Sequence, residues 1–269
     1  MKRILPGNSL ASEQGVAVIA HRGGSGLWPE NTMLAFSNAM VLGVDALEMD
    51  IHSTADGVLV VSHDPDVARV SNGNGRINDL TLTEIKALDA GYWWTADSGQ
   101  SYPFRGQGIT IPTMEEVFQA FPDMWINVDI KQSQPEIVRP FADLIRRYDM
   151  TDKMMVGSFD GRTVAEFRRE CPEVAPAASE NEARLLYGLS VARLERLYWG
   201  KAKAMQLPEY EGRIHVITPR FVEAAHRVGT AVHVWTVDEE ADMQRMIGLG
   251  VDGLMTDYPD RLLKLLGRL

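Results

Sequence analysis

The sequence predicts an α/β fold, a TIM (β/α)8 barrel with an insertion after the second strand. Short apolar runs alternate with amphipathic helical stretches along the 269 residues, which indicates a parallel sheet with helices packed outside it. We count eight such strands, and that number over this length favours a closed barrel over an open sheet, which is the alternative. No stretch rich in Pro, Gly or Ser divides the chain, so we expect residues 1–269 to form one domain.

The expected strands are short and strongly apolar, and they cover residues 16–20, 45–51, 124–130, 154–157, 174–178, 202–207, 231–235 and 251–255. The expected helices separate most of them and cover residues 31–42, 136–148, 161–170, 181–186, 219–228, 239–249 and 259–266. Two further helices are expected to begin at Thr81 and Thr113, each the first residue of a Thr-x-x-Glu capping box. Pro219 suits the first position of a helix, with Thr218 as its N-cap.

One long segment, residues 52–111, interrupts the alternation after the second strand. Asp56-Gly57 predicts a tight hairpin turn into the apolar run 58–61, and a Gly/Asn-rich tip follows. A loop this long in a compact domain is usually functional, and we expect it to lie over one end of the barrel. Five aromatic residues lie between Tyr92 and Phe104. Either they pack the insertion onto the barrel, which we favour, or they wall a pocket for an acyl chain.

Charge and composition exclude several classes of protein. Twenty-seven basic residues against thirty-seven acidic ones give a net charge of −10, which argues against a nucleic-acid partner. No window approaches the roughly 18 continuous apolar residues that a membrane span needs, so we expect no integral membrane segment. The first 15 residues contain no apolar run typical of a signal peptide. The single cysteine, Cys171, excludes an intrachain disulfide, and we expect a cytoplasmic protein.

Polar side chains gather where the predicted strands end. The first strand leads directly into His21 and Arg22, and barrel enzymes keep catalytic groups at the carboxyl ends of their strands. The apolar run 58–61 leads in the same way to His63, at the same expected rim. Two imidazoles near a metal and basic side chains suit general acid and base roles in cleaving a phosphoester. A histidine in a surface loop is the alternative for each.

The second strand carries a polar face. Alternate side chains of a strand share a face, so Glu48, Asp50 and His52 point one way and their apolar neighbours the other. In a barrel the side that faces the helices must be apolar, so we expect the polar face to look inward. Buried carboxylates are costly unless they are paired or bind a cation, and their hard oxygens suit Mg2+ or Ca2+. Neutralisation by Arg or Lys explains the pattern equally well.

The strand at 124–130 repeats this pattern, with Asn127, Asp129 and Lys131 on one face. Asp129 can complete a set of carboxylates around a cation, and Lys131 can meet an anion. The alternative is a salt bridge from Lys131 to Glu48 or Asp50.

A set of short motifs occurs in a fixed order along nearly the whole chain. They are His21-Arg-Gly, Pro29-Glu-Asn-Thr32, Glu48-x-Asp50, Ser62-His63-Asp64, Asp129-x-Lys131, Ser158-Phe-Asp160, Trp235-Thr-Val and Gly253-Leu-Met-Thr-Asp-Tyr-Pro259. Each motif is weak alone, but the ordered set, together with the long insertion, resembles the glycerophosphodiester phosphodiesterase family. The resemblance implies a TIM barrel that hydrolyses small glycerophosphodiesters to an alcohol and sn-glycerol 3-phosphate.

The resemblance also implies a cofactor, one divalent cation, either Mg2+ or Ca2+. Its ligands would be Glu48, Asp50 and Asp129, although the family commonly has Glu at the third position. One methylene less can shift the cation or leave a water in the gap. A second departure is Asp238, which stands where Asn is frequent.

Roles toward the substrate follow from the same resemblance. His21 and His63 would be the general acid and base, in an order that the sequence does not determine. Arg22 and Lys131 would hold the phosphate, and Trp235 would contact the substrate. In the family's usual scheme a neighbouring hydroxyl of the substrate attacks phosphorus, and the cyclic phosphate is then hydrolysed.

Two other functions stay open. Lysophospholipase D would use the same site with a lipid leaving group. A non-catalytic ligand-binding barrel would have lost the chemistry, but both histidines and three carboxylates are present, which argues against it. The preferred alcohol, the metal and the oligomeric state do not follow from the sequence.

Overall fold

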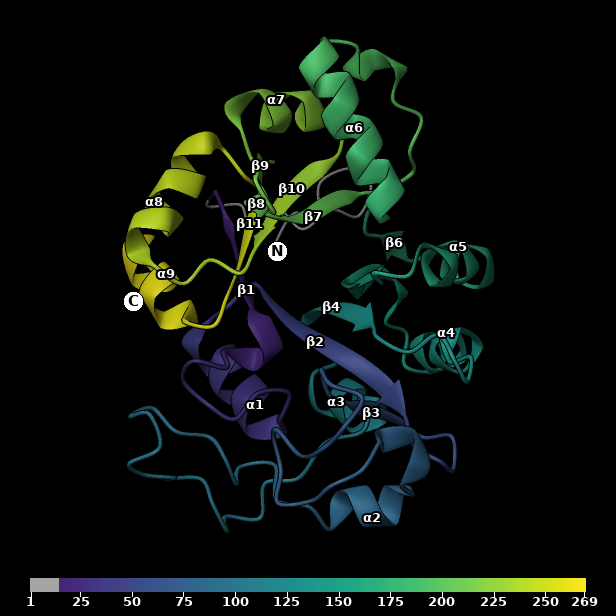
Figure 1. The fold of residues 1–269 in the computed structure, drawn as a ribbon, viewed down its shortest axis with the longest axis vertical. Helices are drawn as coiled ribbons and strands as arrows, with labels where there is room; N and C mark the ends of the chain where they lie inside the picture. The colour runs from purple at the N-terminus through teal and green to yellow at the C-terminus, as the bar shows by residue number, and fades with distance from the viewer. Residues whose placement is uncertain (1–14) are drawn as a thin grey trace.

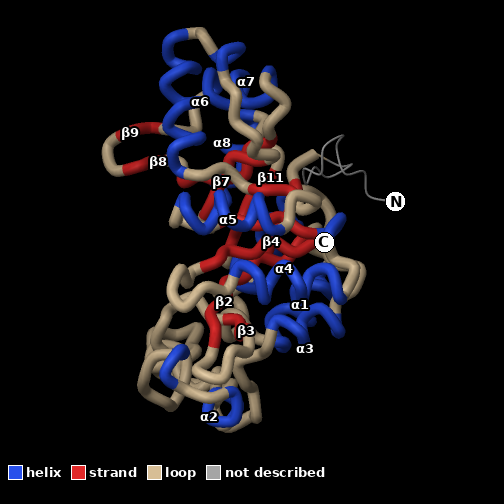
Figure 2. The backbone as a smooth tube through the Cα atoms, turned by 90° about the vertical axis from the view of Figure 1, so that its right-hand side faces the viewer, coloured by secondary structure: helices blue, strands red, loops and turns tan. Residues whose placement is uncertain are grey.

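The computed structural model describes residues 15–269, and within them eight parallel strands form a ring in the order β6-β5-β4-β2-β1-β11-β10-β7. These strands are β1 (Ala17–Ala20), β2 (Ala46–Ser53), β4 (Trp125–Ile130), β5 (Met154–Gly157), β6 (Ala175–Pro176), β7 (Ala204–Pro208), β10 (Ala231–Trp235) and β11 (Gly253–Thr256). A parallel bridge between Ala177 and Ala204 joins the two ends of the ring. The predicted TIM barrel is therefore confirmed, and its strands lie at the centre of the molecule (Figures 1 and 2).

Helices surround the barrel on its outer side (Figure 1). They are α1 (Met33–Leu42), α3 (Met114–Ala120), α4 (Val138–Arg147), α5 (Gly161–Glu170), α6 (Glu180–Ala192), α7 (Pro219–Arg227), α8 (Glu240–Leu249) and α9 (Pro259–Leu265). Among residues 15–269 no helix has the length and apolar character needed to cross a membrane. The N-terminal stretch, for which we expect no signal peptide, lies outside the described residues except for Gly15.

Most predicted helix starts are confirmed. Thr81 and Thr113 each form a complete capping box, and the Thr218 hydroxyl accepts a hydrogen bond from the Phe221 amide with Pro219 in the first turn. The helix predicted at 181–186 is longer, because a capping box at Ser179 starts it earlier and the helix continues to Ala192. A small hairpin after β7, formed by β8 (Tyr210–Glu211) and β9 (Ile214–His215), is not predicted.

Two apolar layers hold the barrel together. The larger layer lies between strands and helices, where Leu47, Met49 and Ile51 of β2 are fully buried. A smaller layer fills one end of the barrel interior and includes Ile19 and Met255. Burial at roughly 25 cal/mol per Å² of apolar surface makes both layers stabilising. The polar face of β2 lies on the inner side, as predicted, beyond this small interior layer.

The insertion has a core of its own. Its strand β3 (Leu59–Val61) pairs antiparallel with the end of β2, which confirms the hairpin at Asp56-Gly57. The remainder contains η2 (Ile77–Asp79) and α2 (Leu82–Lys86), and its buried apolar residues are Val60, Val67, Ile77, Ile85, Ala90 and Ile111. In Figures 1 and 2 it forms the lower end of the molecule, next to β2 and β3.

The aromatic stretch of the insertion packs largely against itself. Trp93 lies edge-on to Tyr92 and Tyr102, with ring centroids 4.7 and 6.0 Å apart. The Arg105 guanidinium lies over Tyr92 and Tyr102, 4.1 and 3.9 Å from the ring centroids. Trp94 instead faces the barrel, where its indole N–H donates to the Ser25 carbonyl at 2.9 Å. These contacts favour the packing role that we expect from the sequence.

Candidate active site

The first two predicted site residues follow β1 directly. His21 and Arg22 lie in a single 3-10 turn, η1 (His21–Gly23), where Arg22 has a positive φ of 52°. Gly23 has a φ of 83°, and a Cβ there would lie 2.8 Å from the Ala35 Cβ, so only glycine fits. This tight turn directs the Arg22 amide into the barrel, where it donates to Glu48 Oε2 at 2.9 Å.

The carboxylates of β2 and β4 meet at the centre of the site. Asp50 and Asp129 are direct neighbours in the parallel register of the two strands. The Lys131 ammonium lies between them, 2.6 Å from Asp129 Oδ2 and 3.1 Å from Asp50 Oδ1. Glu48, two residues before Asp50 and on the same face of β2, is also buried. The salt bridge that we consider as the alternative for Lys131 is therefore present with Asp50, though not with Glu48.

Arg22 extends across the same cluster. Its Nε lies 3.6 Å from Asp50 Oδ2, and its Nη1 donates to Glu30 Oε1 at 3.1 Å. The Asn31 side chain donates to Asp50 Oδ2 at 3.0 Å. Asp50 therefore has three polar partners, and two of them are cations.

The pKa values show where negative charge is left uncompensated. Burial, assisted by the charge of Asp50, raises the pKa of Glu48 to about 7. Burial would also raise the pKa of Asp50, but Lys131 and Arg22 outweigh it and hold that pKa below its ordinary range. The pKa of Asp129 is raised, because burial outweighs the attraction of Lys131. The cluster thus holds more carboxylate charge than Arg22 and Lys131 stabilise, which favours the approach of a further cation.

His21 is held by two carboxylates. Its Nδ1–H donates to Asp257 Oδ1 at 2.7 Å, and its Nε2 lies 3.9 Å from Glu48 Oε2. Burial alone would lower the pKa of His21, but these two carboxylates outweigh burial and raise it. Asp257 is in turn held by Ser25, whose hydroxyl donates to it, and Asp238 accepts the Asp257 amide at 2.8 Å.

Asp257 belongs to the motif that begins at Gly253, but the motif alone does not indicate that it is a site residue. Its position directly after β11 is the available signal, because carboxyl ends of parallel strands meet at one rim. Asp238, the second departure noted in the sequence, supports the backbone at Asp257. Its carboxylate accepts from the Asp257 amide and from the Thr256 hydroxyl, at 2.8 and 3.0 Å.

His63 is held from the insertion. Its Nδ1–H donates to Asp64 Oδ1 at 2.7 Å, and the other oxygen of Asp64 accepts from Arg69 Nε. Arg69 also donates through both terminal nitrogens to Glu30, each at 2.7 Å. One guanidinium therefore connects the loop that carries His63 to the barrel loop after β1, which also carries Arg22.

Trp235 lies near the phosphate-binding candidates but does not pair with them directly. Phe159 stands between, with its ring centroid 5.8 Å from Trp235 and 4.9 Å from the Lys131 ammonium. The Phe159 side chain belongs to the Ser158-Phe-Asp160 motif and is largely exposed. Trp235 and Phe159 together form an aromatic wall at the end of β10.

A cavity of about 340 Å³ opens beside Lys131 and His63. Its lining includes His52, His63, Lys131 and Gln132, with Arg76 and Asn78 of the insertion. It therefore adjoins one predicted catalytic residue, His63, and one predicted phosphate-binding residue, Lys131.

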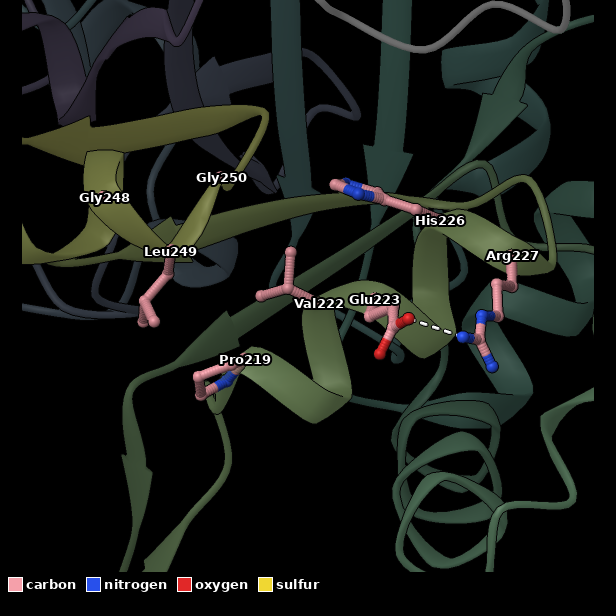
Figure 3. Close-up of a pocket in the computed structure, with 8 residues that line it drawn as sticks. All are labelled: Pro219, Val222, Glu223, His226, Arg227, Gly248, Leu249 and Gly250. Atoms are coloured by element: carbon pink, nitrogen blue, oxygen red, sulfur yellow. Dashed lines mark hydrogen bonds and ion pairs between the residues drawn. The ribbon is translucent and has the colours of Figure 1, made fainter.

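A larger cavity, about 540 Å³, lies elsewhere, between α7 and the carboxyl end of α8 (Figure 3). Its polar side chains are already paired: Glu223 with Arg227, and His226 with Asp252 at 2.8 Å. None of the predicted site residues lines it, so we exclude it as the catalytic site.

The described residues, 15–269, contain no group of three His, Cys, Asp or Glu side chains already spaced around one metal position. The donor chemistry nevertheless fits a hard divalent cation, because Glu48, Asp50 and Asp129 share one inner face. The raised pKa values of Glu48 and Asp129 indicate that their negative charge is not fully compensated. The Lys131 ammonium now contacts Asp50 and Asp129, so a cation would compete with it for the same oxygens.

The fold and this site define a class, a TIM-barrel protein whose rim carries two carboxylate-held histidines and basic side chains, an arrangement typical of hydrolases of anionic esters. A family model of the glycerophosphoryl diester phosphodiesterase family matches residues 21–261. The chain belongs to this family of enzymes, as the motifs indicate. A glycerophosphodiester phosphodiesterase of Caldanaerobacter subterraneus is 36% identical, with 92% of this chain and 96% of that protein covered.

Other relatives differ in their named substrates. A mouse lysophospholipase D is 28% identical, with 91% of this chain and 84% of that protein covered. The crystal structure of an Oleispira antarctica phosphodiesterase in complex with its product sn-glycerol-3-phosphate is 25% identical and superposes with a TM-score of 0.75. It covers 94% of this chain and 97% of its own.

Proposed function

We propose that this protein hydrolyses glycerophosphodiesters to an alcohol and sn-glycerol 3-phosphate. The observation that carries the proposal is the pairing of two histidines with one cluster of cations. Each histidine has its Nδ1 engaged by a carboxylate at 2.7 Å, which leaves Nε2 for the substrate. Arg22 and Lys131 both lie beside Asp50 and would supply positive charge for a diester anion.

The chain's own residues account for the proton transfers. One histidine removes the proton from the attacking hydroxyl, which is the neighbouring hydroxyl of the glycerol unit. The other histidine gives a proton to the oxygen of the leaving alcohol as its bond to phosphorus breaks. A cyclic phosphate results, and water opens it in a second step with the two roles exchanged. Arg22 and Lys131 stabilise the charge on the phosphoryl oxygens throughout.

Glu48, Asp50 and Asp129 would hold one Mg2+ or Ca2+ ion, and the raised pKa values of Glu48 and Asp129 support that proposal. A bound divalent cation would neutralise part of the diester's charge. Asp129 is the ligand most exposed to competition, since Lys131 contacts it at 2.6 Å.

The direct test is release of sn-glycerol 3-phosphate from glycerophosphocholine by the purified chain. Exhaustive EDTA should abolish the release, and Mg2+ or Ca2+ should restore it. Asp129→Asn should raise the metal concentration needed for half-maximal activity more than it lowers thermal stability. Full activity in chelator, with no metal found by elemental analysis, would contradict the metal proposal and leave the salt bridge of Lys131 as the role of these carboxylates.

Lysophospholipase D activity is a second candidate. It is supported by the mouse relative and by Trp93, whose side chain is 47% exposed on the insertion. The same histidines would act, with a lipid on one side of the phosphate. A cytoplasmic location also belongs to the proposal, supported by the single cysteine, Cys171, which is buried and unpaired with any other thiol.

A further inference from the structure

The cavity beside His63 and Lys131 has two fixed walls. The insertion supplies one wall, with Arg76 and Asn78, and the loop after β4 supplies the other, with Gln132. Both ends of the Gln132 amide are engaged, since its oxygen accepts from the Ser53 amide at 3.1 Å and its nitrogen donates to the Pro135 carbonyl at 2.9 Å. This wall is therefore held in place by the barrel itself.

The inner end of the cavity carries little free charge. His52 donates through Nε2 to the His63 carbonyl at 3.2 Å, so this ring nitrogen is already engaged by the backbone. The charge of Lys131 is shared by Asp50 and Asp129. Lys131 is therefore committed to these carboxylates and to the phosphoryl oxygens, and His52 to the backbone.

Arg76 differs from both. Its side chain is exposed at the cavity and forms no ion pair with any residue between 15 and 269. The nearest carboxylate along the paired backbone, Asp66, accepts instead from the Ala68 amide at 2.8 Å. The guanidinium is therefore available to an anionic ligand, for which its planar set of donors is well suited.

The lining lacks the groups that recognise a quaternary ammonium. Among the described residues, no Asp, Glu, Phe, Tyr or Trp side chain lines this cavity. Choline-type cations are bound by aromatic cages or carboxylates, neither of which is available here. Hydroxyl groups and anions, in contrast, would meet amides and a guanidinium.

We propose that this cavity receives the alcohol portion of the diester and that Arg76 selects for alcohols that carry an anionic group. The inference rests on the proposed diesterase function and adds its substrate class: diesters of phosphorylated or carboxylated polyols over those of choline. His63 lies at the cavity, so the alcohol oxygen at phosphorus is next to an imidazole that exchanges its proton.

The experiment compares kcat/KM for three water-soluble diesters of sn-glycerol 3-phosphate, with inositol 4-phosphate, inositol or choline as the alcohol. The wild-type enzyme should favour the inositol 4-phosphate diester over the choline diester, and added salt should reduce that preference. Arg76→Gln should lower the ratio of these two kcat/KM values about three- to tenfold, and Arg76→Glu should lower it further. The matched control is Arg147→Gln, an exposed arginine at the carboxyl end of α4, the end opposite the loop that lines the cavity, and it should leave the ratio unchanged.

Three results would overturn the proposal. An unchanged ratio in Arg76→Gln would mean that the alcohol does not reach Arg76. An equal fall with all three diesters would place the shared glycerol phosphate, not the alcohol, in the cavity. Absence of diesterase activity in the wild-type enzyme would overturn the proposed function together with this inference. Thermal denaturation of each variant separates loss of fold from loss of selectivity.

Discussion

The two histidines of the site have the same kind of hydrogen-bond partner but differ in the groups that surround that partner. In each, Nδ1–H donates to a carboxylate at 2.7 Å. His21 belongs to the barrel, its side chain is 16% exposed, and a second carboxylate, Glu48, lies near its other nitrogen. His63 belongs to the insertion, its side chain is 32% exposed, and the charge of its partner Asp64 is shared with Arg69.

The difference shows how an inserted segment can contribute half of an acid/base pair. The barrel fixes His21 by strand ends that are already adjacent. The insertion instead needs contacts that fasten it to the rim, and Arg69 provides them by joining Asp64 to Glu30. Trp94 provides another through the Ser25 carbonyl, and Ser25 also donates to Asp257, the partner of His21.

Replacement of either histidine should have the largest effect. His21→Ala and His63→Ala should each lower turnover of glycerophosphocholine by about 10²- to 10⁴-fold, because general acid and base groups contribute on that scale. Thermal melts should show a retained fold, since neither residue belongs to the apolar layers. A variant with near wild-type turnover would exclude that histidine as acid or base, and the two histidines would then not act as an acid/base pair.

The second-largest loss of activity should follow from replacing Arg69, which connects the insertion to the barrel. Arg69→Gln should reduce kcat by about 10- to 100-fold, because His63 would no longer be held against the barrel through Asp64 and Glu30. Arg105→Gln is the matched control, a guanidinium of the same insertion that contacts aromatic rings. If both variants lose the same activity, Arg69 stabilises the insertion without positioning His63.

Replacement of Asp257, the carboxylate partner of His21, should shift one limb of the pH profile of kcat/KM. The raised pKa of His21 means that it keeps its proton to higher pH in the native enzyme, and Asp257→Asn removes one cause of that shift. The limb of the kcat/KM profile that belongs to His21 should therefore move to lower pH. Movement of the acidic limb identifies His21 as the base, and movement of the alkaline limb identifies it as the acid. A profile unchanged at both limbs would contradict a titrating role for His21.

The smallest effect concerns the outer rings of the insertion. Trp93→Ala should leave the ratio of kcat/KM for lysophosphatidylcholine and glycerophosphocholine unchanged, because Trp93 packs against Tyr92 and Tyr102. Thermal stability should fall slightly. A selective loss of about 10- to 100-fold on the lysophospholipid would show that the ring contacts an acyl chain and would favour lysophospholipase D.

Local patterns in the sequence determined much of the fold. Apolar runs marked all eight barrel strands to within a few residues, because each strand buries its side chains whichever neighbours it has. Thr81, Thr113 and Thr218 marked helix starts, because a cap satisfies the amides of its own first turn. The alternation along β2 likewise placed Glu48 and Asp50 on the inner face.

The tertiary structure decided which side chains contact one another in the site. Two carboxylates on one face could meet a metal, an arginine or a lysine, and only the register of β2 with β4 set Asp50 beside Asp129 and Lys131. Asp257 reaches His21 across 236 positions of the chain, because closure of the ring brings β11 next to β1. No local rule connects residues so far apart. Strand periodicity determines which face a side chain takes, whereas barrel closure determines which distant side chain it meets.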